Sequence, residues 1–190
     1  MQAARKGVLN EKQLYTYEDY CTWGDSERWE LIEGRPYAMA PAPSYPHQSI
    51  SGKIFYQLAK FLHGKTCEVI SAPFDVRLKT KGKKDTVVQP DLLVICDKLL
   101  IDEKGCNGAP DMIVEILSPS SVTHDMLIKY GLYLKAGVRE YWIVDPGAKT
   151  IITHVLKDGA YERKIYDYPD TAQTTILEGC NVELSEVFEQ

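Results

Sequence analysis

Two acidic residues and one lysine occupy positions where the sequence predicts a chemically active site. Glu115 is the only charge inside the apolar run 112–117, and Asp91 begins a second apolar run that continues to residue 96. Strands this apolar are expected in the middle of a covered sheet, where an unpaired charge is costly. Lys129, on the following segment, could compensate Glu115. Two acids with a nearby lysine suit a hard divalent cation and an anionic substrate.

The elements that position these residues are predicted from hydrophobic periodicity and from turn residues. The pattern predicts strands over 67–70, 74–78, 91–96, 112–117 and 138–145, hairpins over 29–40 and 150–166, and helices over 16–23, 47–63 and 120–134. Gly64 and Gly137 are placed to end the last two helices. The strand–helix–strand order over 112–145 predicts a right-handed crossover and a parallel pair. The segment 174–188 predicts a strand and a short helical turn.

Composition indicates one compact domain with a substantial core. The chain has 190 residues, of which 44% are hydrophobic and 26% charged. We expect a single domain over 1–190 with a loose amino-terminal segment, 1–13. No apolar stretch is long enough for a membrane span, so we expect a soluble, unexported protein. The five cysteines are odd in number and form no C-x-x-C, which favours neither a disulfide framework nor a zinc ribbon and fits a reducing cytoplasm.

The charge balance limits how the protein could meet nucleic acid. The net charge of -5 and the pI near 5.4 argue against non-specific coating of nucleic acid. They do not exclude an enzyme acting on it, because a bound cation would neutralise the local acidic field. The one dense basic run, 79–84, contains Lys81 and Lys83. It predicts either a solvated hairpin loop or a loop that contacts phosphate.

Several segments together resemble a known family. They are WELIEG at 29–34, Pro-Asp at 90–91, EILSPS at 115–120, Asp125 with Lys129, and GVREYWIVD at 137–145. In this order they resemble the Uma family of proposed restriction endonucleases, bacterial proteins of the PD-(D/E)XK nuclease superfamily. The resemblance spans about 16–188. It implies an α/β fold with a restriction-endonuclease-like core: a mixed central sheet flanked by helices, with antiparallel hairpin extensions.

The resemblance also implies roles for the charged residues. Asp91 and Glu115 match the acids that hold Mg²⁺ in the superfamily, with Mn²⁺ as a substitute. A lysine near them positions or deprotonates the attacking water. Its usual place, two residues after the glutamate, is Leu117 here, and the resemblance suggests that Lys129 takes over the role. The alternative is an exposed pair between Asp125 and Lys129 at i, i+4, worth only about 0.3 to 0.5 kcal/mol.

Three further residues are weaker candidates. The resemblance places Glu33 beside the metal acids as an auxiliary acid, whereas its sequence context before Gly34 is that of a hairpin turn. His47 opens a helix, where it could face a phosphate or simply lie on the first turn. Gln89, just before Pro90, could contact substrate. Other hydrolytic chemistries fit worse, since the chain has neither a G-x-S-x-G elbow nor an H-E-x-x-H pair.

Two functions of different classes remain open from the sequence. The first is a Mg²⁺-dependent endonuclease that hydrolyses DNA phosphodiester bonds, with Asp91 and Glu115 as metal ligands, Lys129 as water activator and Glu33 as auxiliary acid. The second is a catalytically inactive nuclease-fold protein that binds nucleic acid or a partner protein. The sequence shows no dimer interface, and a homodimer is left open.

Overall fold

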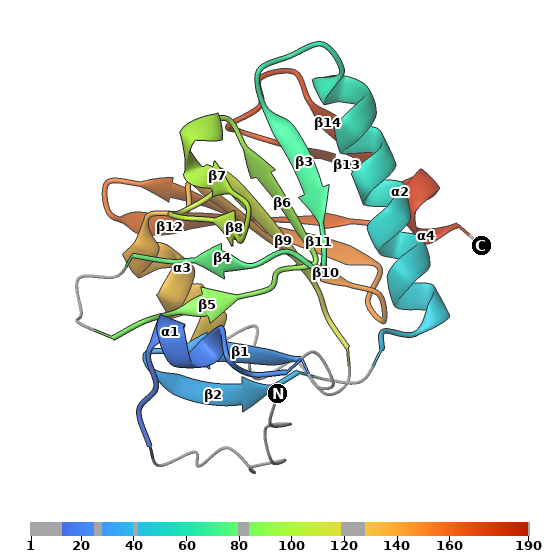
Figure 1. Cartoon of the computed structure of the whole chain (residues 1–190). Helices are drawn as coiled ribbons and strands as arrows, with labels where there is room; N and C mark the ends of the chain where they lie inside the picture. Colours follow the sequence, from blue (N-terminus) through green and yellow to red (C-terminus); the bar gives the residue numbers. More distant parts are fainter. Residues whose placement is uncertain (1–12, 25–27, 40–41, 80–83, 119–127, 190) are drawn as a thin grey trace.

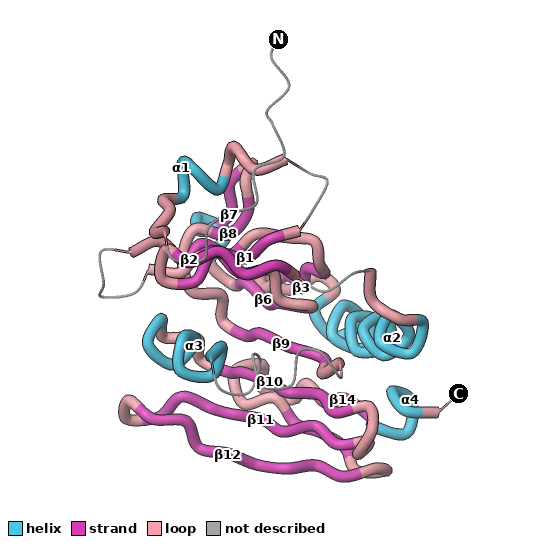
Figure 2. The backbone as a smooth tube through the Cα atoms, turned by 90° about the horizontal axis from the view of Figure 1, so that it is seen from below, coloured by secondary structure: helices cyan, strands magenta, loops and turns pink. Residues whose placement is uncertain are grey.

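The computed structural model describes residues 13–24, 28–39, 42–79, 84–118 and 128–189. Its centre is a mixed sheet, with a long helix and the carboxy-terminal segment on one face and a second, more irregular sheet with a short helix on the other (Figure 1). The short helix α1 (Tyr17–Tyr20) lies beside the second sheet, and the last helix, α4 (Leu184–Phe188), lies on the long-helix side (Figure 2). Most of the candidate site residues lie where the central sheet meets the elements on that second face, whereas His47 comes from the long helix.

The elements have the following bounds in chain order. They are α1 (Tyr17–Tyr20), β1 (Trp29–Ile32), β2 (Arg35–Ala38), α2 (Tyr45–Leu62), β3 (Glu68–Ser71), β4 (Val76–Arg77), β5 (Val87–Val88), β6 (Leu92–Ile95), the 3-10 helix η1 (Lys98–Leu100), β7 (Ile101–Asp102), β8 (Gly105–Cys106), β9 (Met112–Ile116), α3 (Tyr130–Ala136), β10 (Glu140–Asp145), β11 (Thr150–Lys157), β12 (Ala160–Asp167), β13 (Thr171–Gln173), β14 (Asn181–Glu183) and α4 (Leu184–Phe188).

The central sheet has the strand order β12-β11-β10-β9-β6-β3. The pair of β9 and β10 is parallel, as predicted, and the other pairs are antiparallel. All residues of β6 and β9 are buried, and this explains why their sequences are apolar on both faces. The mixed sheet flanked by helices confirms the fold class predicted above.

One face of the central sheet packs against α2. Ile50, Ile54, Leu58 and Leu62 recur at helical spacing and form one core with the even-numbered residues of β6 and β9. The carboxy-terminal elements β14 and α4 complete this core, as the predicted final strand and helical turn. The chain leaves α2 through Gly64, whose φ of 74° favours glycine.

The other face of the central sheet is covered by the second sheet and by α3. The second sheet, β2-β1-β5-β4-β8-β7, was not predicted as a unit because most of its strands contain only two residues. Odd-numbered residues of the central strands, such as Leu93 and Ile113, face Val76 and Val88 of the second sheet and Leu132 of α3. Alternation along β6 and β9 therefore sends Asp91 and Glu115 toward this second face.

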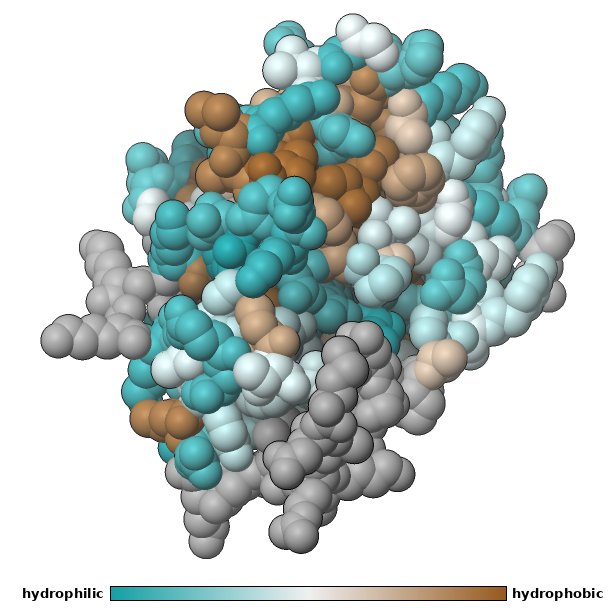
Figure 3. Space-filling view, viewed as in Figure 1, coloured by the Kyte–Doolittle hydropathy of each residue, from teal (hydrophilic) through white to brown (hydrophobic). Residues whose placement is uncertain are grey.

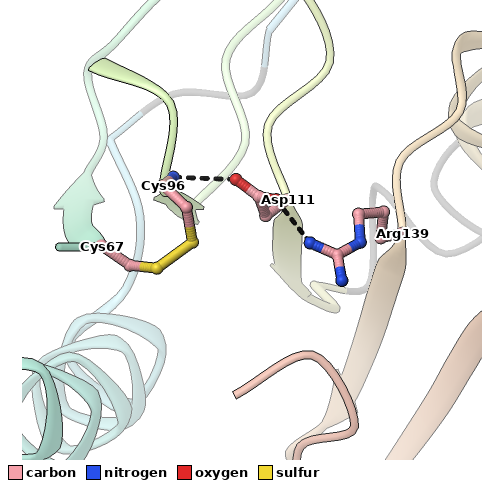
Figure 4. The surroundings of a disulfide bond; sticks show 4 residues. All are labelled: Cys67, Cys96, Asp111 and Arg139. Carbon is pink, nitrogen blue, oxygen red and sulfur yellow. Dashed lines mark hydrogen bonds and ion pairs between the residues drawn. A yellow bond between two sulfur atoms is a disulfide. The ribbon is translucent and has the colours of Figure 1, made fainter.

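The cysteine count and spacing favoured no disulfide framework, but two of the five cysteines are paired. Cys67 and Cys96 form a disulfide between the ends of β3 and β6. Figure 4 shows it beside Asp111, which accepts a hydrogen bond from the Cys96 backbone N–H (2.8 Å) and pairs with Arg139 (2.9 Å). The pairing depends on strand register, which the 29-residue separation does not reveal. It removes one argument for a reducing compartment.

The polar segment 97–109 contains η1, β7 and β8, which the sequence analysis did not predict. Leu99, in η1, is 92% exposed. Figure 3 shows that apolar residues gather on the surface in this region, over β7, β6 and β3. Among the described helices, none is long and apolar enough to cross a membrane.

Candidate active site

Asp91 and Glu115 lie on neighbouring central strands. The antiparallel register of β6 and β9 pairs Leu92 with Val114 and Leu93 with Ile113. One further step sets Asp91 across from Glu115, and directly opposed side chains have Cβ atoms about 5 Å apart. Asp91 Oδ2 also accepts a hydrogen bond from the Ile116 backbone N–H at 2.8 Å. The predicted pair of acids is therefore brought together by strand register.

Lys129 lies between two buried carboxylates. Its Nζ is 2.9 Å from Glu115 Oε1 and 3.0 Å from Glu30 Oε1, and the side chains of all three residues are at most 5% exposed. Ile128 and Lys129 form a π-helical turn directly before α3. The alternative of an exposed i, i+4 pair does not describe this lysine, which is buried among acids; Asp125 itself lies outside the described residues.

Tyr133, one turn further along α3, fixes Glu115 from a second direction. Its hydroxyl donates to Glu115 Oε1 at 2.6 Å, and the side chain is fully buried. Burial, together with the Glu115 and Glu30 carboxylates, holds the pKa of Tyr133 well above its usual range. The hydroxyl therefore stays protonated and acts as a donor. The sequence analysis did not single out Tyr133, because a tyrosine at helical spacing is typical of a core position.

Glu30 is the acid that the sequence analysis missed. It occupies an inward position of β1 and is 3% exposed, and the Gln89 backbone N–H donates to its Oε1 at 3.0 Å. Its signal was an acid within an otherwise apolar strand, the same signal that identified Glu115. Glu33, the predicted auxiliary acid, lies elsewhere: it occupies the β1–β2 turn with φ 49°, its side chain is 53% exposed, and it lies 3.8 Å from Lys135.

His47 is brought to the same strand ends as Asp91. It lies in the first turn of α2, and its Nε2 is 3.2 Å from Asp91 Oδ2 and 3.1 Å from the Ile116 carbonyl oxygen. The side chains of His47 and Asp91 are 12% and 23% exposed. Asp91 is thus the acid of the site that solvent reaches most readily. The fold therefore places an imidazole beside the more accessible carboxylate.

Three weaker candidates for substrate contacts remain, and the structure describes one of them, Gln89. Gln89 is held inside the protein by Arg28, Asp75 and Tyr20, in addition to its backbone bond to Glu30. Lys81 and Lys83 lie outside the described residues. They connect β4 to β5, which pair antiparallel as the predicted hairpin requires.

The arrangement supplies hard oxygen donors and a cation in one place. Asp91 and Glu115 are the carboxylates that could share a divalent ion, and Lys129 supplies positive charge next to Glu115. Among the described residues, no group of three or more histidine, cysteine, aspartate or glutamate side chains stands in a metal-binding arrangement. The site therefore offers two carboxylates rather than a dedicated cage.

Carboxylates on adjacent strands of a mixed sheet, with a buried lysine behind them, define a nuclease-like α/β protein. The model of the family "Uma2: Putative restriction endonuclease" matches residues 14–185. The chain belongs to this family. A solved structure described as a "putative nuclease belonging to DUF820", from Anabaena variabilis, has a similar fold: its TM-score is 0.73 at 20% identity, covering 91% of this chain and 97% of that one.

A curated relative is similar over part of the chain. The "Uncharacterized protein slr1290" of Synechocystis is 30% identical over 120 residues, which cover 61% of this chain and 60% of that protein. The chain thus aligns with less than two thirds of the length of this relative.

Proposed function

We propose that the protein is a Mg²⁺-dependent endonuclease that hydrolyses DNA phosphodiester bonds. The observation that carries the proposal is the ammonium of Lys129 held between Glu30 and Glu115, with Asp91 across the strand pair. Hydrolysis of a phosphodiester builds negative charge on the attacking, leaving and non-bridging oxygens. A site for this reaction needs groups that are oriented in advance, and this cluster fixes the Lys129 ammonium beside the Glu115 carboxylate.

The donor set fits Mg²⁺, with Mn²⁺ as a substitute. Mg²⁺ is usually bound by one or two carboxylates and completes its shell with waters and substrate phosphate oxygens. Asp91 and Glu115 provide two carboxylates from opposed positions, and Asp91 is partly open to solvent. When bound, the ion would stabilise the developing charge as a Lewis acid.

The protein's own residues have separate tasks in this proposal. Glu115 is oriented by Tyr133 and Lys129, so that its carboxylate does not have to reorganise during the reaction. Lys129 orients the attacking water and stabilises nearby negative charge, and Glu30 keeps the ammonium in position. His47, beside Asp91, is placed to contact a substrate phosphate.

The test is cleavage of supercoiled plasmid in Mg²⁺ and in Mn²⁺. Asp91→Asn and Glu30→Gln each remove one acid with little change in shape, and we expect each to lower the cleavage rate by at least about 100-fold, which is about 2.7 kcal/mol of barrier. The matched control is Glu33→Gln, which neutralises an exposed acid of the same hairpin and should cleave like wild type. Equal rates in all four proteins would refute the proposal.

One observation favours a second function. The ammonium of Lys129 already contacts both Glu30 and Glu115 and offsets one of their two negative charges, so part of the compensation of the buried acids comes from the protein itself. This is compatible with a nuclease-fold protein that binds nucleic acid or a partner protein without cutting. If wild type binds DNA but cleaves no plasmid, single strand or duplex in either metal, this second function replaces the first.

A further inference from the structure

Arg28 lies at the entrance to β1, two residues before Glu30. Its carbonyl oxygen accepts a hydrogen bond from the Met39 backbone N–H at 2.9 Å, so the strand pairing of β1 and β2 continues through it. Because residues i and i+2 of a strand point to the same face, Arg28 extends on the side that carries Glu30. Its side chain is exposed, whereas that of Glu30 is buried. It therefore reaches the surface next to the acid cluster.

Gln89 connects the two residues. Its side-chain oxygen accepts from Arg28 Nε at 3.1 Å and Nη2 at 2.8 Å, and its backbone N–H donates to Glu30. The amide nitrogen donates to Asp75 Oδ1 at 2.8 Å. Since that carboxylate can only accept, the amide is turned with its oxygen toward Arg28. Gln89 thus fixes the exposed guanidinium of Arg28 relative to the buried carboxylate of Glu30.

The charge of Arg28 is held in place without being neutralised. Arg77 and Arg139 each pair with an aspartate, as is usual for a structural arginine. Arg28 instead donates to a neutral amide, and within the described part of the chain its guanidinium forms no ion pair. A guanidinium has five N–H donors, so it can hold Gln89 and still donate to another acceptor. The arrangement preserves a positive charge for an external anion.

We propose that Arg28, oriented by Gln89, receives a phosphate group of the nucleic acid backbone beside the candidate active site. This inference rests on the proposed function and adds a substrate-positioning residue to it. A planar guanidinium matches two phosphate oxygens, and contacts of this kind fix the register of a nucleic acid without reading its sequence. In an acidic protein, such a contact beside the acids would help a polyanion to approach them.

The experiment measures binding of labelled 20-nucleotide probes, one duplex and one single strand, over a range of salt concentrations. Ca²⁺ replaces Mg²⁺ because it binds the same oxygen ligands. We expect Arg28→Ala to weaken binding about 10-fold or more, because a charge-assisted hydrogen bond is lost. The slope of log K against log salt should fall by about 0.9 for duplex or about 0.7 for single strand. Arg28→Lys should keep most of the slope.

The controls separate this contact from folding and from general charge. Arg163→Ala removes an exposed arginine from β12, at the far edge of the central sheet, and should bind like wild type. If Arg28→Ala does not fold, Arg28→Gln replaces it, because this variant removes the charge but keeps a donor for Gln89. The slope of log K against log salt for Arg28→Gln then tests the contact. If the slope of log K against log salt is unchanged in a folded variant, the phosphate contact of Arg28 is refuted, but the proposed function is not. Wild type that binds neither probe overturns the proposed function as well.

Discussion

Replacing Lys129 by methionine tests whether the buried charges form one unit. The two contacts of the ammonium, at 2.9 and 3.0 Å, are each worth about 5.5 kcal/mol of attraction at an effective dielectric constant of about 20. Desolvation of three buried charges opposes this gain by several kcal/mol per ion. The net cost of removing one partner from such a cluster is about 3 to 5 kcal/mol, because Glu30 and Glu115 then stay buried without compensation.

Urea denaturation at pH 8 without divalent metal measures this cost. We expect the free energy of unfolding of Lys129→Met to fall by about 3 to 5 kcal/mol. Lys135→Met is the matched control, since Lys135 is on the same helix but 66% exposed, and it should change stability by less than about 0.5 kcal/mol. A triple variant that also carries Glu30→Gln and Glu115→Gln should recover most of the loss, because no buried charge is left over.

Two results would refute the reasoning. If Lys129→Met is as stable as Lys135→Met, the three side chains do not form a dry ion cluster. If the triple variant is no more stable than Lys129→Met, the loss comes from packing of the lysine stem rather than from uncompensated carboxylates. Plasmid cleavage by Lys129→Met should fall by at least about 100-fold in the same preparation, whichever variant is more stable.

Three other perturbations have defined outcomes. Tyr133→Phe removes the donor to Glu115 and should cost about 1 to 3 kcal/mol of unfolding free energy and lower the Mg²⁺ response of cleavage, whereas Tyr166→Phe should do neither. Burial lowers the pKa of His154 below its ordinary value, so the stability that the neutral imidazole contributes is present above the unfolded pKa of about 6.5 and is lost as the pH falls. His154→Phe should therefore flatten the pH dependence of the unfolding free energy between about pH 7 and 5. Identical pH profiles for the variant and wild type would contradict this. Removing divalent metal with a chelator should abolish cleavage but leave the melting temperature of wild type nearly unchanged, because Lys129 pairs with both Glu30 and Glu115 when no metal is bound. A large fall in melting temperature would show a structural metal.

The elements that carry the site could be predicted because their apolar patterns are unambiguous. β6 and β9 are buried on both faces, and α2 has one continuous apolar face. Each pattern reflects burial within one element, which a sequence records directly. The second sheet could not be predicted in this way, because strands such as β4, β5 and β8 have two residues each and owe their existence to partners distant in the chain.

The acids of the site also differ in how clearly the sequence shows them. Glu115 and Glu30 have the same signature, one carboxylate in an apolar strand, but the shorter strand β1 gave a weaker pattern. The resemblance instead directed attention to Glu33, three residues later, which lies in the turn. The position of Lys129 needed tertiary information, because no sequence spacing shows that a residue fourteen positions from Glu115 returns to contact it.

The location of the ammonium bears directly on the choice between a nuclease and an inactive relative. In a site built for metal alone, the buried acids would repel each other whenever the ion leaves, and the apo protein would be unstable. Here Lys129 offsets one of the two charges of Glu30 and Glu115, while Asp91, the more exposed acid, pairs with His47, whose charge depends on protonation. This pairing reduces the repulsion between the buried acids when no metal is bound, and the metal that we propose would meet Asp91 as the more accessible carboxylate. Asp91 also has structural contacts, since it accepts from the Ile116 backbone N–H and pairs with His47, so loss of cleavage in Asp91→Asn without loss of stability is the outcome that separates a nuclease from an inactive relative.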